Sequence, residues 1–191
     1  MQPAFLDMLY CPKSGQKLTW FPNTRFANVK PQSGKLLSQD QRITYEVVDG
    51  VARFVQPDNY ASNFGYQWNK FRTTQLDSNS NLTISGDRFW QSTRWDPSEM
   101  KGKWILDAGC GMGRFAEIAL KSGAQVVALD YSNAVDACYE NLKHHKNLHV
   151  IQADIYNLPF APDTFTYIYS CLLYTSPSPR DLSTSRMPSS A

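Results

Sequence analysis

The side chains with the clearest chemical potential lie in a glycine loop and in two acids that follow it along the chain. The loop reads DAGCGMG and places glycines at alternate positions after an aspartate. Glycine allows sharp backbone turns and lets a ligand approach without a Cβ atom in the way. Two later apolar segments also end in an aspartate, and a carboxylate is a strong hydrogen-bond acceptor. The candidate binding residues are therefore Asp107, Gly109, Gly111, Gly113, Asp130 and Asp154.

These candidates lie at the ends of segments that alternate between strand-like and helix-like patterns. The apolar segments WILDAG, AQVVALD, LHVIQAD and FTYIYS are interspersed with the helix-like segments RFAEIALKSG and NAVDACYENLKHH. This alternation predicts a parallel sheet with helices on its faces, which is an α/β, Rossmann-like fold. Gly123 is expected to close the first helix and Ser132 to cap the second. Ligands bind at the carboxyl ends of strands in open α/β sheets, so we expect the candidates to converge there.

The order of these motifs resembles the class I S-adenosylmethionine-dependent methyltransferases, within the broad type-11 methyltransferase domain group. The resemblance covers residues 104–170, where D-x-G-x-G-x-G is followed by acids that end the second and third strands. It implies the first four strands of a seven-stranded methyltransferase sheet, with S-adenosylmethionine as the cofactor. The implied reaction is methyl transfer to a small-molecule acceptor. No residue is assigned as a catalytic base.

The resemblance also implies a role for each candidate residue. Asp107 would favour the cationic methionine end of the cofactor, while the backbone of the three glycines makes room for it. Asp130 would accept both ribose hydroxyls, and Asp154 would accept from the adenine amino group. Further contacts with adenine and ribose are implied for Tyr131, Ser132 and Ile155. In related enzymes the segment before the first strand often covers the cofactor. Candidates for lining the pocket are therefore Tyr66, Gln67 and Trp68. The alternative is that this segment is an amphipathic helix whose aromatic side chains belong to the core.

Two other functions remain open on the same residues. The stretch GMGRFA satisfies the G-x-G-x-x-G/A fingerprint of dinucleotide-binding proteins, which would make the chain an NAD-dependent oxidoreductase. That register begins two residues late relative to the strand end and leaves Asp107 and Gly109 unexplained. A S-adenosylmethionine-binding or regulatory module that retained the pocket without catalysis would carry the same motifs.

The N-terminal part is expected to form two further units. Residues 1–57 predict a small β-rich module, in which Asp49-Gly50 suits a tight hairpin. This module resembles the zinc-ribbon activator module of some tRNA- and protein-modifying methyltransferases. Ser14 stands where that module has a second cysteine, so no metal is predicted. Residues 58–103 are expected to form a helical connector that covers the cofactor. Its expected helix starts and stops are Ser85, Asp96, Pro97 and Gly102.

Composition and charge exclude several classes of partner. The net charge is +2, with 19 basic and 17 acidic residues interspersed, so neither nucleic acid nor a membrane surface is an expected partner. No apolar run is long enough to span a bilayer, and the N-terminus does not read as a signal peptide, so a cytoplasmic location is expected. The four cysteines form no C-x-x-C pair and are expected to be buried free thiols.

The last segment departs from the methyltransferase pattern. Thr166 occupies a position where the family usually has an aspartate, and residues 171–191 are rich in Ser, Thr and Pro. We expect this segment to be disordered and non-native, because CLLYTSPSPRD resembles translated adaptor sequence from library preparation. The chain is therefore expected to be a fragment, unstable or inactive, with an unpaired sheet edge and an apolar face that lacks its helices.

Overall fold

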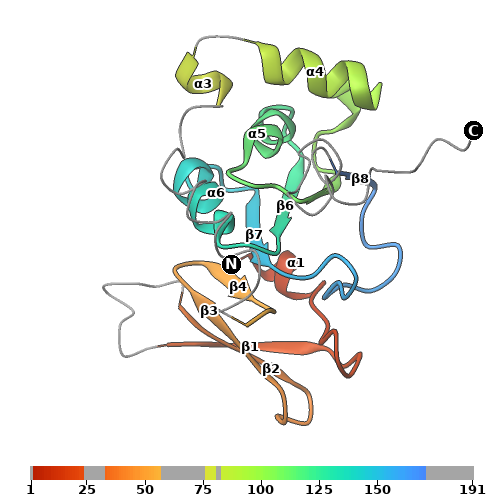
Figure 1. Cartoon of the computed structure of the whole chain (residues 1–191). Coiled ribbons are helices and arrows are strands. Elements are labelled where there is room, and N and C mark those ends of the chain that lie inside the picture. Colours follow the sequence, from red (N-terminus) through yellow and green to blue (C-terminus); the bar gives the residue numbers. More distant parts are fainter. Residues whose placement is uncertain (1, 24–32, 57–75, 81–82, 171–191) are drawn as a thin grey trace, which may run out of the picture.

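A single mixed sheet runs through the computed structural model, which describes residues 2–23, 33–56, 76–80 and 83–170. Within these residues, eight strands follow the order β1-β2-β3-β4-β7-β6-β5-β8. Figure 1 shows the antiparallel strands at one end of the molecule and the helices around the parallel strands at the other. The strands are β1 (Leu18–Pro22), β2 (Gly34–Ser38), β3 (Thr44–Val48), β4 (Val51–Arg53), β5 (Trp104–Ala108), β6 (Gln125–Asp130), β7 (Leu148–Gln152) and β8 (Tyr167–Tyr169).

The parallel half of the sheet has the alternation of strand and helix that the sequence predicts. Strands β5, β6 and β7 pair in parallel and are linked by α5 (Arg114–Lys121) and α6 (Ala134–Leu142). Strand β8 pairs in parallel with the other side of β5, so the strand order reverses beside β5. Open α/β sheets bind ligands at such a switch point, outside the carboxyl ends of the strands. This topology confirms the α/β, Rossmann-like fold class.

Local sequence accounts for several helix starts and ends. The Asp96 carboxylate accepts the amide two residues on at 2.8 Å, and Pro97 follows it, so both mark the start of the 3-10 helix η2 (Pro97–Glu99) as predicted. Helix α5 ends just before Gly123, whose φ of +84° suits a glycine helix stop. Asn133 occupies the N-cap position of α6, one residue after the predicted cap Ser132, but the Ser132 hydroxyl oxygen still accepts the first amide of the helix, from Ala134, at 3.2 Å.

The prediction that Ser85 caps a helix is wrong. Helix α4 (Ile84–Thr93) begins one residue earlier, so Ser85 lies inside its first turn and is buried. The cap comes from α3 (Asp77–Ser80), where the Asp77 carboxylate accepts the amides of Ser85 and the next residue at 3.1 and 2.9 Å. An acid eight residues upstream therefore satisfies the helix-terminal amides. The Ser85 hydroxyl accepts from Arg114 Nε at 2.8 Å, which ties α4 to α5.

Strands β1 to β4 form an antiparallel meander that continues into the parallel strands. Asp49 and Gly50 turn β3 back into β4 with φ values of 49° and 88°, as a tight hairpin turn needs. Strand β4 then pairs in parallel with β7, where Ala52 lies opposite Ile151. The N-terminal strands thus extend the sheet beyond β7. The expected division of the chain into separate domains stays a prediction.

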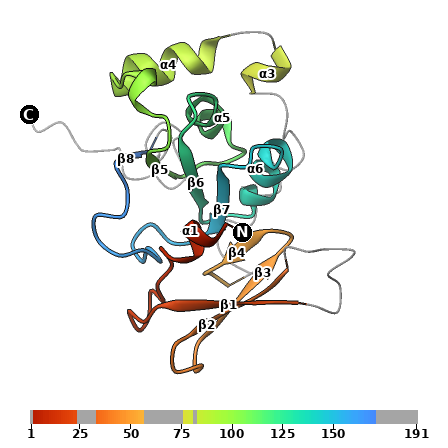
Figure 2. The ribbon, with the colours of Figure 1, turned by 180° about the vertical axis from the view of Figure 1, so that it is seen from behind.

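Each face of the parallel strands is buried by a different part of the chain. Helices α4, α5 and α6 cover one face, with a core that includes Phe89, Ile105, Phe115, Val126, Ala128 and Cys138. The other face packs against Phe5 of α1 (Pro3–Leu6) and against Leu9, and this α1 side is seen in Figure 2. The strand residues buried there are Leu106, Val127, Leu129 and Ile151. The expectation of an apolar face without cover is therefore wrong for β5, β6 and β7.

Strand β8 lies at the end of the described sheet. Its Ile168 side chain is 59% exposed, whereas Tyr169 is buried. Residues 171–191 lie outside the described part of the chain, so the expected non-native tail and the fragment stay predictions. Of the helices that the structure describes, none is both long enough and apolar enough to cross a membrane.

Candidate functional site

The glycine loop joins β5 to α5 and is held against the end of β6. The amides of Gly109 and Cys110 both donate to the Leu129 carbonyl, at 2.7 and 2.9 Å. Gly109 and Gly111 have φ values of 89° and 53°, in the region that residues with a Cβ atom rarely adopt. The loop therefore favours glycine at both positions, and its backbone lies beside the strand end that carries Asp130.

Gly113 meets a different requirement, the close packing of α5 against α6. It directly precedes α5 and has a φ of +95°. A Cβ atom at this position would lie 2.6 Å from Leu142 Cδ1 and 2.9 Å from Cys138 Sγ, closer than normal van der Waals contact. Helix packing therefore explains the third glycine of the motif, whichever ligand binds.

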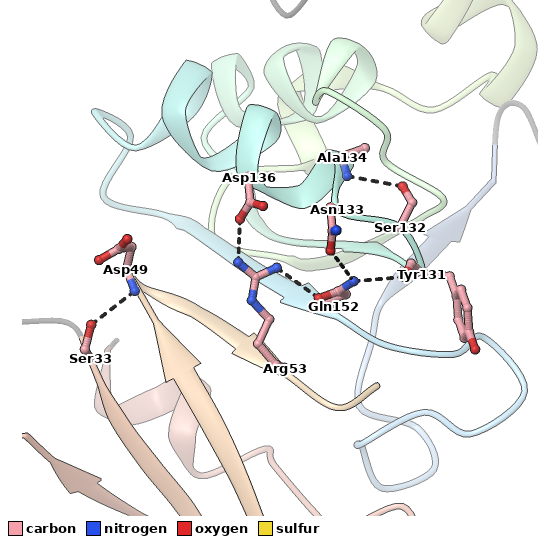
Figure 3. Close-up of polar contacts among 9 residues, drawn as sticks. All are labelled: Ser33, Asp49, Arg53, Tyr131, Ser132, Asn133, Ala134, Asp136 and Gln152. Carbon is pink, nitrogen blue, oxygen red and sulfur yellow. Dashed lines mark hydrogen bonds and ion pairs between the residues drawn. The ribbon is translucent and has the colours of Figure 1, made fainter. Parts of the chain in front are cut away.

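Asp130 connects the glycine loop to the loop between β6 and α6. Its Oδ2 atom accepts the Gly111 amide at 3.0 Å, while its Oδ1 atom accepts the Ser132 amide and hydroxyl at 2.8 and 2.7 Å. The Ser132 oxygen in turn accepts the Ala134 amide at the start of α6 (Figure 3). One carboxylate thus sets the relative position of the two loops in which the sequence places the binding site.

Asp107 is the buried acid of the site. Its side chain is 2% exposed, and its Oδ2 atom has no hydrogen-bond partner among the described residues. Burial raises the pKa of the Asp107 carboxyl to about 7, against the opposing influence of the Tyr169 phenol, and the Asp130 charge acts in the same direction as burial. A nearby cation would stabilise the ionised carboxylate, so this position suits a ligand with an ammonium group.

Tyr169 is a site residue that sequence reasoning missed. It lies directly opposite Asp107 in the register of β5 and β8, and its hydroxyl is buried with no hydrogen-bond partner in the part of the chain that the structure describes. Its ring packs edge-on against Phe89 of α4, with centroids 4.9 Å apart. The two-residue period of β8 places Tyr167 and Tyr169 on one face, but the register against β5 is not a local property of the sequence.

The end of the third parallel strand lines a cavity shared with the N-terminal strands. Asp154 accepts the Tyr156 amide at 2.9 Å and the Asn157 side chain at 3.2 Å. Ile155 is half-buried against the core cluster that contains α1. The cavity has a volume of about 520 Å³ and is lined by Pro12, Lys13, Phe54, Val55, Gln56, Tyr131, Asp154 and Asn157. Sequence reasoning did not include the N-terminal residues that line this cavity, because no local sequence pattern predicts the pairing of β4 with β7.

The structure therefore brings most of the predicted residues to one edge of the sheet. Asp107, Asp130 and Asp154 lie at or just beyond the carboxyl ends of β5, β6 and β7, which are neighbours. The pocket-lining candidates Tyr66, Gln67 and Trp68 lie outside the described residues.

The cysteines that the structure describes are free thiols, as the sequence suggests. Cys11, Cys110 and Cys138 are free and buried, and the fourth cysteine lies outside the described residues. The Cys11 sulfur lies 3.3 Å from the Tyr45 hydroxyl. No cluster of three or more His, Cys, Asp or Glu side chains that could hold a metal ion occurs within residues 2–23, 33–56, 76–80 and 83–170.

Known proteins resemble the half of the chain that holds this site. The family model described as a methyltransferase domain matches residues 105–186. A demethylmenaquinone methyltransferase from Corynebacterium urealyticum is 35% identical over 89 residues, which cover 46% of this chain and 37% of that protein. Phosphoethanolamine N-methyltransferase 3 from Arabidopsis thaliana is 36% identical over 83 residues, covering 40% of this chain and 17% of that protein.

A solved structure of phosphoethanolamine N-methyltransferase 1 from Haemonchus contortus is also similar. It is 17% identical with a TM-score of 0.42, and the match covers 61% of this chain and 26% of that one. The chain spans 37% or less of the length of these three relatives.

Proposed function

We propose that this chain, which carries a methyltransferase domain, transfers a methyl group from S-adenosylmethionine to a small-molecule acceptor. The environment of Asp107 carries the proposal. Asp107 is a buried carboxylate with one oxygen unpartnered among the described residues, and it lies beside the glycine loop at the switch point of the sheet. Two further acids, Asp130 and Asp154, follow at the ends of the next two strands.

The charge of the site favours S-adenosylmethionine over a dinucleotide. S-adenosylmethionine carries an ammonium, a sulfonium and a carboxylate and is a cation overall, whereas NAD carries an anionic pyrophosphate. A phosphate group at the glycine loop would lie near the buried carboxylate of Asp107, and like charges repel strongly where water is excluded. This repulsion supports methyl transfer over the chemistry of an NAD-dependent oxidoreductase.

We assign the methionine end of the cofactor to Asp107 and the glycine loop. Asp130 would hold the ribose. Its Oδ1 atom already accepts two hydrogen bonds and Oδ2 accepts one, so ribose hydroxyls would replace some of these contacts. Each oxygen of Asp154 accepts one hydrogen bond and keeps a second lone pair for the adenine amino group. Adenine and ribose contacts are also assigned to Tyr131, Ser132 and Ile155.

The chain contributes alignment and exclusion of water rather than acid–base chemistry. The bound cofactor supplies a methyl group on a positively charged sulfur, which an in-line nucleophile can displace. Packed rings beside β8 keep water from the Asp107 side of the sheet, with Phe89 and Trp95 at 5.9 Å and Trp95 and Tyr167 at 4.6 Å between centroids. No residue is assigned as a general base.

A small-molecule acceptor is supported by charge and by the names of the relatives. The names of the Corynebacterium and Arabidopsis proteins each contain a small molecule, demethylmenaquinone and phosphoethanolamine. The net charge of +2, with 19 basic and 17 acidic residues, gives no electrostatic reason to expect nucleic acid as the acceptor.

Isothermal titration calorimetry with S-adenosylmethionine, S-adenosylhomocysteine and NADH tests the proposal. We expect the first two ligands to bind and NADH not to bind. Asp130→Ala should weaken binding about 10- to 100-fold, because a hydrogen bond to a charged group contributes about 1.5–3 kcal/mol. Asp96→Ala is the matched control, since Asp96 is an exposed acid that caps η2. Binding of NADH alone, or equal effects of the two substitutions, would contradict the proposal.

A second assay separates an enzyme from a binding or regulatory module. The chain is incubated with S-adenosylmethionine that carries a labelled methyl group and with a cell extract, and the label is followed into small molecules. We expect transfer that Asp130→Ala reduces. Intact cofactor binding without any transfer would identify a binding module instead.

A further inference from the structure

We infer that Arg53, at the end of β4, is a positioning residue that orders the β6–α6 loop, residues 131–133, through the side chain of Gln152. The inference rests on the proposed function, because this loop carries the residues assigned to the ribose and adenine. It makes the N-terminal strands part of the cofactor site rather than an attached unit.

Arg53 lies where the antiparallel and parallel strands meet. It is opposite Gln152 in the parallel register of β4 and β7, and its side chain is 18% exposed. Its Nη1 atom donates to Gln152 Oε1 at 3.0 Å, and its Nη2 atom donates to Asp136 in the first turn of α6 (Figure 3). One guanidinium therefore contacts both β7 and the helix that follows the loop.

The Gln152 side chain connects Arg53 to the β6–α6 loop. Its side chain is buried, with the residue 2% exposed. Its Nε2 atom donates to the Tyr131 carbonyl at 3.1 Å and to Asn133 Oδ1 at 3.0 Å, as Figure 3 shows. Both amide hydrogens are thus used on the loop, while the amide oxygen is used on Arg53.

The chemistry of an amide makes this chain of contacts directional. If the Gln152 amide flipped, its NH2 group would face the Arg53 guanidinium and its oxygen would face the Tyr131 carbonyl. Donor would then meet donor and acceptor would meet acceptor. A buried polar group that loses its partner costs free energy, so Arg53 holds Gln152 in the orientation that serves the loop.

Both Gln152 and Asp130 form hydrogen bonds with the β6–α6 loop. The Asp130 carboxylate accepts the Ser132 amide and hydroxyl, and the Gln152 side chain donates to the carbonyl of Tyr131. Loss of either contact would let the loop sample other conformations before a ligand binds. Ordering it on binding would then lower the apparent affinity.

Arg53 also docks the N-terminal strands, so the test must separate docking from loop positioning. Gln152→Glu keeps the side-chain shape and strengthens the contact with Arg53, yet it removes both donors to the loop. Arg53→Met removes the guanidinium from both partners. Lys35→Met is the matched control, because Lys35 forms an exposed ion pair with Glu46 on the same meander, 3.3 Å apart, away from the loop.

Two measurements on the full chain carry the test. Calorimetry gives the affinity for S-adenosylhomocysteine, and hydrogen exchange gives the protection of the Ser132 and Ala134 amides without ligand. We expect Gln152→Glu to weaken S-adenosylhomocysteine binding about tenfold and to speed exchange at both amides, and to lower the thermal unfolding midpoint because a buried carboxylate oxygen would face the Tyr131 carbonyl. Arg53→Met should show the same effects, and Lys35→Met should show none of them.

Unchanged affinity and unchanged exchange in Gln152→Glu would overturn the inference and leave Arg53 a docking residue. If Arg53→Met does not fold, Gln152→Glu still decides the outcome. If the unmodified chain and Lys35→Met bind no S-adenosylhomocysteine, the proposed function fails, whereas the exchange measurement still tests the link from Gln152 to the loop.

Discussion

Replacement of Asp107 by asparagine probes the buried acid that carries the proposed function. In the folded chain, burial raises the pKa of this carboxyl from its ordinary value of 3.8 to about 7. Asparagine has nearly the same shape and no charge. The variant therefore removes a buried ionisation while it leaves the volume of the site almost unchanged.

The expected change in the free energy of unfolding follows from the pKa of Asp107 in the folded and in the unfolded chain. The folded pKa is higher than the unfolded one, so folding favours the protonated acid. The wild type therefore loses stability as pH rises from about 4 to about 7. A difference of about three pKa units corresponds to about 4 kcal/mol in the free energy of unfolding. As pH rises from about 4 to about 7, the stability of Asp107→Asn relative to the wild type should therefore increase by up to about 4 kcal/mol.

Urea unfolding of both proteins at several pH values between 4 and 8 measures this change. Any fixed cost of the buried asparagine amide shifts the whole difference and leaves its pH dependence intact. Asp96→Asn is the control, because hydrogen bonding from Ser98 lowers the pKa of the exposed Asp96 carboxyl, so its difference from the wild type changes mainly below about pH 4 and stays nearly flat over this range. A difference between Asp107→Asn and wild type that is flat across this range would refute the assignment of Asp107 as a buried, uncompensated acid.

The same acid links ligand binding to pH. An ammonium group placed beside Asp107 would lower its pKa again, so binding should release a proton near pH 6 to 7. We expect the affinity for S-adenosylhomocysteine to rise with pH through this range in the wild type and to be flat in Asp107→Asn. Calorimetry in buffers of different ionisation enthalpy detects the released proton. Binding without proton release would contradict the placement of the methionine end.

Three further substitutions test packing and burial in the fold. Gly113→Ala should lower the free energy of unfolding by about 3 kcal/mol in urea titration, because its Cβ would meet Leu142 and Cys138 at a positive φ. Gly102→Ala, also at positive φ but with open space around it, should cost about 1 kcal/mol, and equal losses would contradict the packing role. Burial lowers the pKa of His149 to about 4, so the fold favours the neutral ring and loses up to about 3 kcal/mol as pH falls from 6.5 to 4. His149→Phe should remove that loss from acid-unfolding curves, and parallel curves for variant and wild type would disprove it.

The parallel half of the fold is predictable because its signals are local. Apolar runs of strand length, the glycine stop at Gly123 and the Asp96-Pro97 start each depend on a few neighbouring residues. The order of acids at successive strand ends then places the candidate site at one edge of the sheet. These features appear in the structure where the sequence places them.

The rest depends on contacts between distant residues, which a local pattern does not encode. Asp77 replaces the expected serine cap of α4 because the chain folds back over eight residues. Tyr169 meets Asp107 only through the register of β8 on β5. Arg53 reaches Gln152 across 99 residues of sequence, so its place beside the β6–α6 loop has no signature in the N-terminal segment.

The pairing of β4 with β7 has a consequence for how the chain is made. Strand β4 leaves the ribosome 99 residues before its partner position in β7, which takes about 5 to 20 s at ordinary rates of synthesis. During that interval the outer edge of β4 lacks the strand it pairs with, and an open strand edge can recruit other chains. Closing so long a loop is also slow. The nascent N-terminal meander therefore exposes an open strand edge until β7 has been synthesised.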